Sequence, residues 1–457
     1  MNPSTHFDLL CLGSGPAGQR AAVQAAKLGK RVLLIEKGKR VGGVCLHSGT
    51  IPSKTFREAV SLFIRRSPLG ERPVLDDLMG RVCEVVKRET DVIENQLRRN
   101  DISLVAGEGF FKDPHTVVVE TPRGWETFEA DKMLIAVGTR PSVPRGVELD
   151  GNVVITSDDV LNLTKLPKSI TIVGAGVVGI EYASMLAPLG VSVTLVDKRD
   201  LPLEFVDREI VEELMHQMRN LKVTFRLGEG VSSVEIIEGP PRRASILLDS
   251  GKKIVSDLVL YSAGRSGNTD RLNLKAAGIE ADDRGRIKVN ETFQSSAPHI
   301  YAAGDVIGYP SLAATSSEQG RLAACHAFGL DSGPMESHFP IGIYSIPEIS
   351  MVGQTESELT KAKIPYETGI ARYREIARGQ ILGDDSGMFK MIFHRETKQL
   401  LGVHAIGTGA TELIHIGQAV LGLGGGLNYF LKTVFNYPTL AECYKVAALD
   451  ASNKMLR

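Results

Sequence analysis

The fold of this chain is decided by FDLLCLGSGPAG, residues 7–18. Residues 7–12 form a short apolar run before a glycine, which predicts a buried strand. Residues 19–28 favour a helix, and residues 31–35 predict a second strand that ends at Glu36. The order of strand, glycine-rich turn, helix, strand and acid is typical of a dinucleotide-binding unit.

Each glycine of this turn has a physical role. Gly13 makes the tight turn, Gly15 lets the backbone approach a pyrophosphate, and Gly18 allows the helix to pack closely on the strand. Free backbone amides and the positive end of the helix dipole would then meet the phosphates. Glu36 is placed to accept hydrogen bonds from ribose hydroxyls. A glycine-rich turn without a ligand is the alternative.

A second copy of the unit begins with SITIVGAGVVG, residues 169–179. Strand, glycine turn, helix and strand follow in the same order and end at Asp197. In both copies the acid lies 23 residues after the first glycine. This shared register indicates an internal duplication. We therefore expect two bound dinucleotides and electron transfer between them.

Three charged residues, Asp197, Lys198 and Arg199, end the second unit. Asp197 favours a free ribose 2′-hydroxyl and repels a 2′-phosphate, whereas Lys198 and Arg199 would attract that phosphate. A solvated loop is the alternative, since charge runs are usually exposed. The run is compatible with both NAD and NADP.

Composition and charge exclude several classes of protein. Lys and Arg total 53 against 54 Asp and Glu, so the chain has no basic excess for binding nucleic acid. The five cysteines form no CxxC pair, which argues against a disulfide scaffold or a zinc site. The histidines have no metal-ligand spacing, and we expect no metal. No run approaches the ~18 apolar residues of a membrane span, and residues 1–6 lack a basic leader, so we expect a cytoplasmic protein.

The rest of the chain predicts a third domain and a return of the chain to the first unit. A later predicted strand ends at Gly304-Asp305. From about residue 333 the pattern changes to short strands and a glycine-rich helix, which predicts a separate α+β domain. Residues 68–100 predict a long helix, and Pro141 and Pro144 predict a boundary before the second unit.

The loop GGVCLHSGTIPSK, residues 42–54, carries a family resemblance. Together with both glycine units and Gly304-Asp305, it closely resembles the pyridine-nucleotide disulfide oxidoreductases. In that family the loop holds two cysteines that form a redox disulfide beside FAD. Here the two positions hold Cys45 and Thr50, so no disulfide can form within the loop.

A second departure from the family lies in FNYPTLAE, residues 435–442. The family has a histidine base where this chain has Tyr437, although Glu442 is kept. Tyrosine is a poor base at neutral pH, because its hydroxyl ordinarily holds its proton until about pH 10. One branch of the family is similar at both departures and along the whole chain, including GIYSIPE at residues 342–348: the soluble, FAD-containing pyridine nucleotide transhydrogenases.

The resemblance implies an enzyme that moves hydride between NADPH and NAD⁺ through FAD, with both nucleotides using one site in turn. FAD would be the resident cofactor, and NAD(H) and NADP(H) the substrates. A diaphorase that reduces a quinone or dye from NAD(P)H is the alternative, since only the electron acceptor differs. A flavin-bearing structural subunit without turnover is a third reading, against which both complete dinucleotide units argue.

The resemblance also implies the architecture. The chain would be α/β, with two Rossmann-like dinucleotide-binding domains, for FAD and NAD(P), and a C-terminal α+β dimerisation domain. The expected boundaries are 1–150 for the first FAD-binding segment, 151–270 for the NAD(P)-binding domain, 271–332 for the return to the FAD domain, and 333–457 for the dimerisation domain. We expect a homodimer or a larger homo-oligomer, with no nucleic-acid or membrane partner.

The resemblance assigns roles residue by residue. The expected FAD contacts are Gly13, Gly15, Gly18, Glu36, Gly43, Cys45, Thr50, Lys54, Gly109, Thr139, Arg140, Gly304, Asp305 and Ala313. The expected NAD(P) contacts are Gly174, Gly176, Val178, Gly179, Asp197, Lys198, Arg199, Gly264 and Arg265. The expected catalytic residues are Lys54, Glu181, Tyr437 and Glu442.

Two of these assignments have structural alternatives. Lys54 would lie near flavin N5 and pair with Glu181, but a surface lysine and an ordinary helix ion-pair ladder are the alternatives. Cys45 is expected to pack beside the flavin rather than act as a thiol, since most free cysteines behave as small hydrophobic side chains. The same packing role is expected of the other four cysteines: Cys11, Cys83, Cys325 and Cys443.

Overall fold

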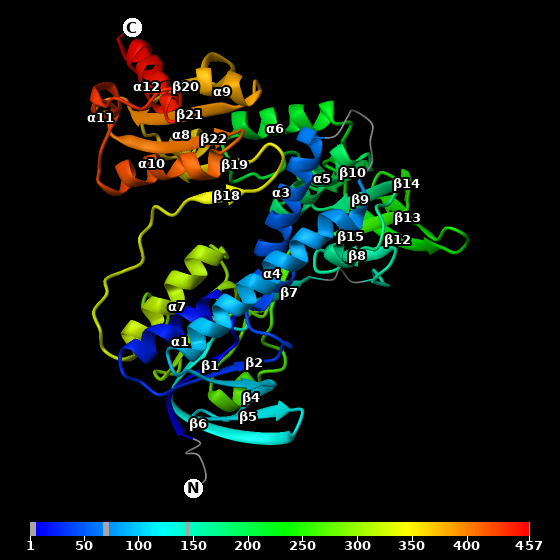
Figure 1. The fold of residues 1–457 in the computed structure, drawn as a ribbon, viewed down its shortest axis with the longest axis vertical. Coiled ribbons are helices and arrows are strands. Elements are labelled where there is room, and N and C mark those ends of the chain that lie inside the picture. The colour runs from blue at the N-terminus through cyan, green and yellow to red at the C-terminus, as the bar shows by residue number, and fades with distance from the viewer. Residues whose placement is uncertain (1–5, 67–72, 143–145, 457) are drawn as a thin grey trace.

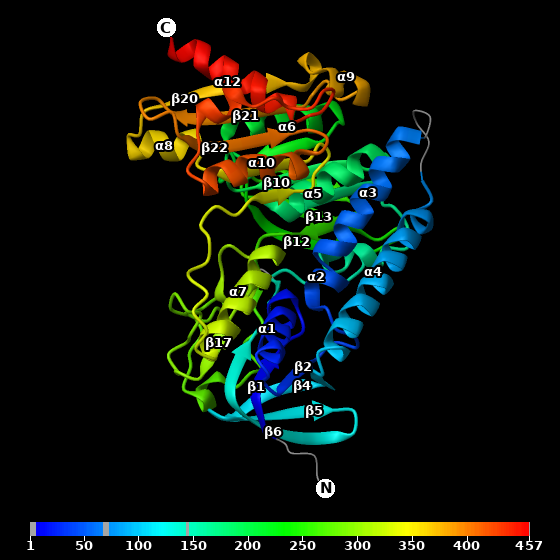
Figure 2. The same ribbon diagram turned by 60° about the vertical axis from the view of Figure 1, so that its left-hand side comes forward.

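The computed structural model describes residues 6–66, 73–142 and 146–456. Three bodies follow one another between the end that carries the N-terminus and the end that carries the C-terminus (Figure 1, Figure 2). Pro68, Pro144 and residues 1–5, on which the expected helix start, boundary and missing leader depend, lie outside the described residues. No helix in the described ranges is long and apolar enough to cross a membrane.

The first body is built on a seven-stranded sheet in the order β3-β2-β1-β6-β5-β4, with β17 paired to β6. Its strands are β1 (His6–Leu12), β2 (Val32–Glu36), β3 (Ser103–Ala106), β4 (Glu108–Asp113), β5 (Thr116–Thr121), β6 (Gly124–Ile135) and β17 (Ile300–Ala302). β17 runs parallel to β6 although the whole second body lies between them in the sequence. The chain therefore returns to its first sheet, which brings Gly304 and Asp305 beside the first glycine turn.

Helices accompany this sheet: α1 (Pro16–Lys27), α2 (Gly43–His47), α3 (Thr50–Arg66), α4 (Leu75–Arg98) and α7 (Ala313–Ala327). α1 and α7 cover one face of it, with the C-terminal end of α4 beside them. α3 and the N-terminal half of α4 instead pack on apolar residues of the second body. α1 and α7 lie side by side (Figure 1). They touch at Gly320, where a Cβ would overlap the carbonyl oxygen of Ala17. On the opposite face, β4 and β5 at the end of the sheet fold back so that their apolar side chains pack on those of β1 and β2. A segment that includes η3 (Leu274–Ala277) packs there as well.

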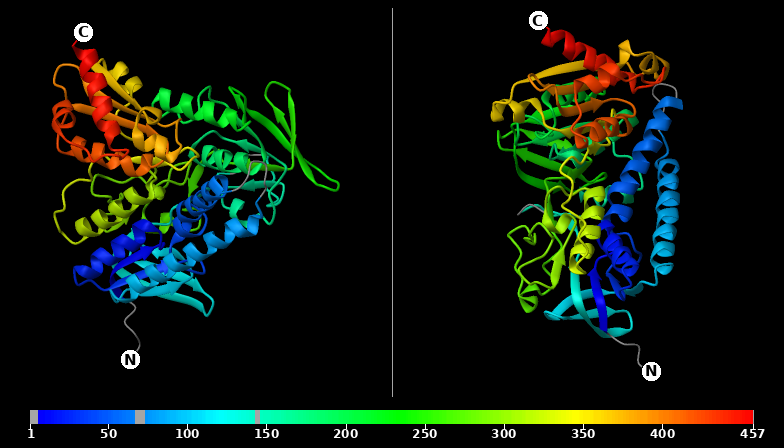
Figure 3. Two further views of the ribbon diagram at one scale, coloured as in Figure 1. Left: turned by 45° about the horizontal axis from the view of Figure 1, so that its top comes forward. Right: turned by 90° about the vertical axis from the view of Figure 1, so that its left-hand side faces the viewer.

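The second body has a parallel sheet in the order β11-β10-β9-β15-β8. Its strands and helices are β8 (Val154–Thr156), η1 (Val160–Asn162), β9 (Ser169–Val173), α5 (Val177–Leu186), η2 (Ala187–Leu189), β10 (Ser192–Asp197), α6 (Arg208–Asn220), β11 (Thr224–Leu227) and β15 (Leu258–Tyr261). A three-stranded antiparallel sheet, β12 (Val231–Ile237), β13 (Arg243–Leu248) and β14 (Lys253–Ser256), projects from it (Figure 3). A two-stranded ribbon, β7 (Thr139–Pro141) with β16 (Arg265–Gly267), joins the first two bodies.

The third body is an antiparallel sheet in the order β18-β19-β22-β21-β20, with helices packed on it. Its elements are β18 (Ile341–Ile343), β19 (Ile349–Gly353), α8 (Glu356–Ala362), β20 (Tyr366–Arg372), η5 (Tyr373–Glu375), α9 (Ala377–Leu382), β21 (Met388–His394), β22 (Leu400–Ile406), α10 (Ala410–Gly422), α11 (Leu427–Lys432) and α12 (Glu442–Met455). α12 lies on β20 so closely that a Cβ on Gly369 would overlap the carbonyl oxygen of Ala447.

The expected fold class is confirmed: a mixed α/β sheet and a parallel α/β sheet are followed by an α+β body. The numbered domain boundaries stay predictions. The helix of the second unit changes from the α-helical α5 to the 3₁₀-helical η2 after Leu186, because Pro188 lacks a backbone N–H. The expected packing of Cys83 is wrong: it is exposed on α4, whereas Cys11, Cys325 and Cys443 are buried. α4 is amphipathic, and Leu78 and Val82 occupy its buried side.

Candidate functional site

The first glycine turn has the geometry that each of its glycines was predicted to need. Gly13 follows β1 with φ +102°, a conformation that favours glycine. A Cβ on Gly18 would overlap the carbonyl oxygen of Gly13, so α1 packs against the turn without space for a side chain. Gly15 has open space instead, with no heavy atom within 4 Å of the position its Cβ would take. Packing therefore requires Gly18, whereas Gly15 leaves room for a ligand.

Ser14 connects this turn to Glu36 and was missed by the sequence analysis. The Glu36 carboxylate accepts hydrogen bonds from the backbone N–H of Ser14 at 3.0 Å and of Gly38 at 2.6 Å. The Ser14 hydroxyl donates to the same carboxylate and accepts from the Gly42 N–H at 2.9 Å. The central position of the G-x-G triplet was the available signal. Ser14 thereby connects the turn, the acid at the end of β2 and the loop at residues 42–54.

A cavity of about 610 Å³ opens beside this turn. Such a volume is typical of a ligand site. Of the expected FAD contacts, the cavity is lined by Gly13, Gly15, Glu36, Gly43, Cys45, Thr50, Gly109, Thr139, Gly304, Asp305 and Ala313. Gly18, Lys54 and Arg140 are not among its lining residues. Arg140 instead pairs with Asp270 at 2.5 Å.

The chemistry of this cavity fits a dinucleotide with a diphosphate. The first turn of α1 has no acidic residue, and Lys37, Lys39 and Arg40, which the sequence analysis did not single out, add positive charge to the lining. Arg271 also lines the cavity, where it pairs with Glu108 at 2.9 Å. The Asp305 carboxylate also faces the cavity and makes only long contacts of 3.4 Å, to the hydroxyls of Thr139 and Ser316. It therefore keeps capacity to accept hydrogen bonds from ligand hydroxyls.

Lys54 and Glu181 form the expected ion pair between the first and second bodies. The Lys54 ammonium lies 2.9 and 2.8 Å from the two carboxylate oxygens of Glu181. The Glu181 side chain is 5% exposed and that of Lys54 is 25% exposed. Glu181 also accepts a hydrogen bond at 2.9 Å from the N–H of Tyr344, which belongs to the third body. Tyr344 was missed as a partner, although it lies in the GIYSIPE run.

The second glycine turn repeats the first in atomic detail. Gly174 has φ +110°, and a Cβ on Gly179 would overlap the carbonyl oxygen of Gly174. Gly176 again has open space around the position of its Cβ. Val178 lies between them on α5 and is half-buried. The internal duplication inferred from the sequence is therefore a duplication in structure.

Asp197, at the end of β10, is buried and fully hydrogen-bonded. Its carboxylate accepts from the backbone N–H of Ala175 at 2.5 Å and of Arg199 at 2.9 Å. The Arg199 guanidinium adds two bonds, from Nε at 2.9 Å and from Nη2 at 2.7 Å. Burial alone would raise the pKa of Asp197, but the hydrogen bonds from Arg199 and Ala175 outweigh it and lower that pKa. Asp197 is therefore held as a carboxylate.

Two other expected NAD(P) contacts, Gly264 and Arg265, lie at the ribbon between the bodies. Gly264 has φ +116° and precedes β16. Arg265 donates to the hydroxyl of Thr139 at 2.8 Å and to its carbonyl oxygen at 2.9 Å. The structure thus places Arg265 against a residue of the first cavity.

Cys45 lines the first cavity without a second cysteine beside it, and all five cysteines of the chain are free thiols. Burial raises the pKa of the Cys45 thiol, an effect that Thr50 opposes in part. A thiol that keeps its proton is a poor nucleophile. This environment agrees with a packing role for Cys45.

Tyr437 and Glu442 lie in the third body, and neither lines the first cavity. Tyr437 is 67% exposed in a loop between α11 and α12. Glu442 begins α12, and its Oε2 atom is buried without a hydrogen-bond partner. Within one chain the structure does not bring these two residues to Lys54.

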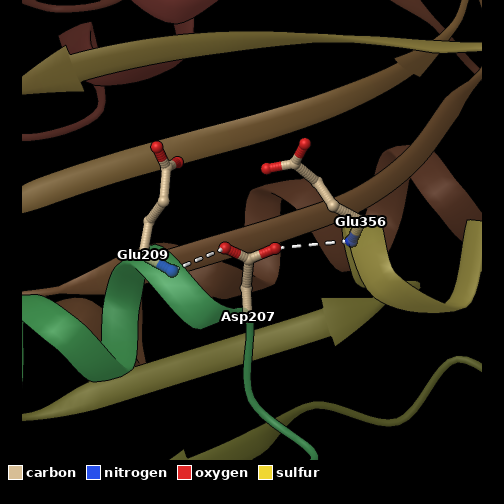
Figure 4. Close-up of side chains that lie close together, drawn as sticks. All are labelled: Asp207, Glu209 and Glu356. Atoms are coloured by element: carbon tan, nitrogen blue, oxygen red, sulfur yellow. Dashed lines mark hydrogen bonds between the residues drawn. The ribbon is translucent and has the colours of Figure 1, made fainter. Parts of the chain in front are cut away.

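A cluster of three acids joins α6 to α8, and the sequence analysis did not find it (Figure 4). Asp207, Glu209 and Glu356 lie within the distance that could hold a metal ion. The ammonium of Lys390, fully buried on β21, supplies the positive charge instead. It lies 2.9 Å from Asp207 and 2.7 Å from Glu209 and also pairs with Glu356. The cluster is an ion-pair network between the second and third bodies.

Comparison with known proteins matches both parts of the chain. Residues 7–320 match the pyridine nucleotide-disulphide oxidoreductase family, and residues 339–448 match the dimerisation domain of that family. A soluble pyridine nucleotide transhydrogenase from Mycobacterium bovis is 53% identical over 98% of both chains. One from Aliivibrio fischeri is 45% identical over 99% of this chain and 98% of that protein.

Solved structures agree with the sequence comparisons. LpdA from Mycobacterium tuberculosis has a TM-score of 0.89 at 27% identity and covers 96% of this chain and 98% of its own. A Cu(II) complex of the HOCl-induced flavoprotein disulfide reductase RclA from Escherichia coli has a TM-score of 0.90 at 26% identity, over 98% and 99% of the two chains. The chain belongs to the pyridine nucleotide-disulphide oxidoreductase family.

Proposed function

We propose that this chain is an FAD-dependent transhydrogenase that moves hydride between NADPH and NAD⁺. The observation that carries the proposal is the first cavity, where Cys45 faces Thr50 rather than a second cysteine. A disulfide would pass electrons onward to a thiol substrate. Without one, a second nicotinamide nucleotide is the natural acceptor. The relatives named as soluble pyridine nucleotide transhydrogenases support the same activity.

The first glycine turn would hold FAD, which supplies the hydride acceptor and donor when bound. Backbone amides at the start of α1 would meet the diphosphate, Glu36 a ribose, and Asp305 the hydroxyls of the linking chain; Glu36 and Asp305 both line the cavity. The closed packing at Gly18 keeps these groups in place. The chain thus supplies orientation and shelter from water rather than its own redox group.

The second glycine turn would hold the nicotinamide nucleotides, which use one site in turn. Gly176 leaves room for a diphosphate, and Asp197 lies where it can meet the adenosine ribose. Lys54 and Glu181 connect this body to the first cavity, because one is on α3 and the other on α5. The pair would fix the angle at which a nicotinamide approaches the flavin.

The match to a dimerisation domain supports a homo-oligomer. Exposed apolar side chains of the third body, including Leu423 and Val434, are available for such a contact. We infer that Tyr437 and Glu442 act across this interface in the partner's cavity. We also infer a cytoplasmic location, which the relatives' description as soluble supports.

Anaerobic titration tests the proposal. The purified holoenzyme is titrated with dithionite and then mixed with NAD⁺ or NADP⁺ while flavin absorbance is followed. Uptake of two electrons per FAD, followed by recovery of the absorbance with both nucleotides, is the expected result. Uptake of four electrons would indicate a disulfide reductase. Dye reduction from NAD(P)H without recovery by either nucleotide would indicate a diaphorase.

A further inference from the structure

The two glycine units hold their terminal acids with equivalent backbone amides. In the first unit these amides belong to Ser14 and Gly38, and in the second to Ala175 and Arg199. Ser14 and Ala175 each follow the first glycine of their turn, and Gly38 and Arg199 each come two residues after the acid. Each copy therefore serves as a reference for the other.

The copies differ in the side chain two residues after the acid. Gly38 has none, so Glu36 is covered there by backbone alone. Arg199 carries a guanidinium that pairs with both oxygens of Asp197. The Arg199 side chain is 38% exposed, whereas that of Asp197 is 8% exposed. In the nucleotide copy, a cation that solvent can reach lies over a buried carboxylate.

The backbone around this pair is held by its own hydrogen bonds, so the guanidinium could change partners by side-chain rotation alone. The carbonyl oxygen of Arg199 accepts from the Gly228 N–H at 3.0 Å, and that of Asp197 accepts from the Glu229 N–H at 3.0 Å. If the guanidinium left, the Asp197 carboxylate would keep its bonds to two backbone amides. The acid thus stays in place and partly satisfied whether or not Arg199 is paired with it.

We propose that Arg199 is a movable arm that lets one ribose site accept both coenzymes, an inference that rests on the proposed function. With NAD(H), Arg199 keeps one of its two side-chain bonds to Asp197, and the 2′-hydroxyl donates to the carboxylate in place of the other. With NADP(H), the 2′-phosphate binds the guanidinium of Arg199. The guanidinium then lies between the phosphate and the Asp197 carboxylate and screens the repulsion between these two anions. The guanidinium exchanges a carboxylate partner for a phosphate partner, so the ion pair that it gives up is replaced by another and neither coenzyme is excluded.

Adenosine 2′,5′-bisphosphate and adenosine 5′-monophosphate test the arm by calorimetry on the holoenzyme. Arg199→Gly, which copies the first unit, should weaken binding of the bisphosphate at least about tenfold, while the monophosphate changes less than about threefold. Arg199→Lys keeps the charge without the fork and should fall between wild type and Arg199→Gly. Lys252→Ala removes an exposed positive charge that pairs with Glu229 rather than Asp197, and should match wild type. Equal weakening of both probes by Arg199→Gly would overturn the proposal.

Asp197→Ala tests the other half of the exchange. It frees the guanidinium, so the bisphosphate should bind as in wild type or up to about fivefold more tightly. The monophosphate should bind more weakly, because the ribose loses its acceptor. Equal weakening of both probes would contradict the proposed competition. The Arg199 variants decide the question by themselves if Asp197→Ala does not fold.

Stopped-flow measurement separates failure of the arm from failure of the proposed function. Flavin absorbance of the wild-type holoenzyme is followed anaerobically with NADH and with NADPH. A response to neither nucleotide would contradict the transhydrogenase proposal. A response to both, with Arg199→Gly keeping the wild-type preference, would contradict the arm alone. We expect Arg199→Gly to have an apparent affinity for NADPH at least about tenfold lower than that of wild type, with its apparent affinity for NADH unchanged.

Discussion

At the scale of single residues, Glu181 is where three parts of the chain meet. Its buried carboxylate accepts from Lys54 on α3 and from the backbone of Tyr344 in the third body. The Lys54 ammonium also lies 5.2 Å from the centre of the Tyr344 ring. A buried carboxylate depends on its positive partner and its donors. The position of the Lys54 side chain between the first and second bodies therefore depends on Glu181.

Glu181→Gln is expected to slow hydride transfer from NADH and NADPH by the same factor, about 10-fold to 100-fold. The amide oxygen still accepts from Tyr344, but Lys54 loses its charged partner and its fixed position. Anaerobic stopped-flow kinetics measure the effect. The control is Glu58→Gln, which changes an exposed acid on α3, the helix that carries Lys54, and should behave like wild type. If hydride transfer slowed with only one of the two nucleotides, Glu181 would instead be assigned to nucleotide recognition.

At the scale of elements, the glycines of each βαβ unit divide into those needed for packing and those that leave space. Gly18 and Gly179 bring a helix against the preceding turn, where a Cβ would overlap a carbonyl oxygen. Gly15 and Gly176 have no neighbour within 4 Å of an added Cβ. Because both copies show the same division, we expect the two open positions to admit a ligand and to tolerate a side chain without disturbing the fold.

Gly15→Ala and Gly176→Ala form a matched pair. As apoproteins, both should fold with a melting temperature near that of the wild-type apoprotein. Gly15→Ala should be purified with much less FAD, because the methyl group occupies the diphosphate position. Gly176→Ala should keep FAD but bind nucleotides at least about tenfold more weakly. The flavin absorbance per protein and calorimetry with NADP⁺ provide the two readouts. Equal FAD loss in both would contradict the assignment of the units.

Gly18→Ala is the packing counterpart. A methyl group at this position meets the backbone of Gly13 rather than a flexible side chain, so α1 must move away from β1. We expect a loss of at least about 3 kcal/mol in the free energy of unfolding. Chemical denaturation measures it. A Gly18→Ala protein as stable as Gly15→Ala would show that the packing argument is wrong.

At the scale of the whole molecule, Lys390 fastens the second body to the third. Lys390→Met should lower the free energy of unfolding by about 3–5 kcal/mol, because it leaves the buried carboxylate of Asp207 without its cation. Thermal or urea unfolding measures the loss. Lys454→Met removes an exposed i,i+4 pair with Asp450 and should cost no more than about 0.5 kcal/mol. A small loss of stability in Lys390→Met would mean that water reaches the Asp207 carboxylate between the second and third bodies.

The same network makes stability depend on pH in a defined direction. Burial alone would raise the pKa of Asp207, but the positive neighbours, Lys390 among them, lower it below the ordinary value. The stability that this carboxylate contributes is present above about pH 4 and is lost as the pH falls through its lowered pKa. Wild type should therefore lose more stability between about pH 5 and pH 3 than Lys390→Met does. Parallel pH profiles of the two proteins would contradict this assignment.

Oligomerisation is expected to depend on α10. Leu423 is 87% exposed beside an apolar groove that also contains Ile416 and Tyr429. Leu423→Asp should leave the fold of one chain intact but dissociate the oligomer, because a charge in a buried interface has no partner. Light scattering measures the mass. Val255→Asp, on the projecting β14, is the matched control and should leave the mass unchanged.

The sequence by itself determined the local units of this protein. Strand, turn, helix, strand and acid follow one another within a single register, and near neighbours decide such patterns. The replacement of a cysteine by Thr50 and the presence of two dinucleotide units were readable for the same reason. Most of the expected FAD contacts line one cavity because they belong to such local motifs.

Only the tertiary structure decided which charged groups meet. Tyr344 at Glu181, Arg265 at Thr139 and the three acids around Lys390 come from segments far apart in the sequence. A charged side chain carries no local signal for its partner, because the packing of whole bodies selects it. The pairing of Arg199 with Asp197 shows this at short range. These two charged residues, separated by Lys198, could both have faced solvent or a ligand. The hydrogen-bonded backbone around them instead brings the Arg199 guanidinium against the Asp197 carboxylate.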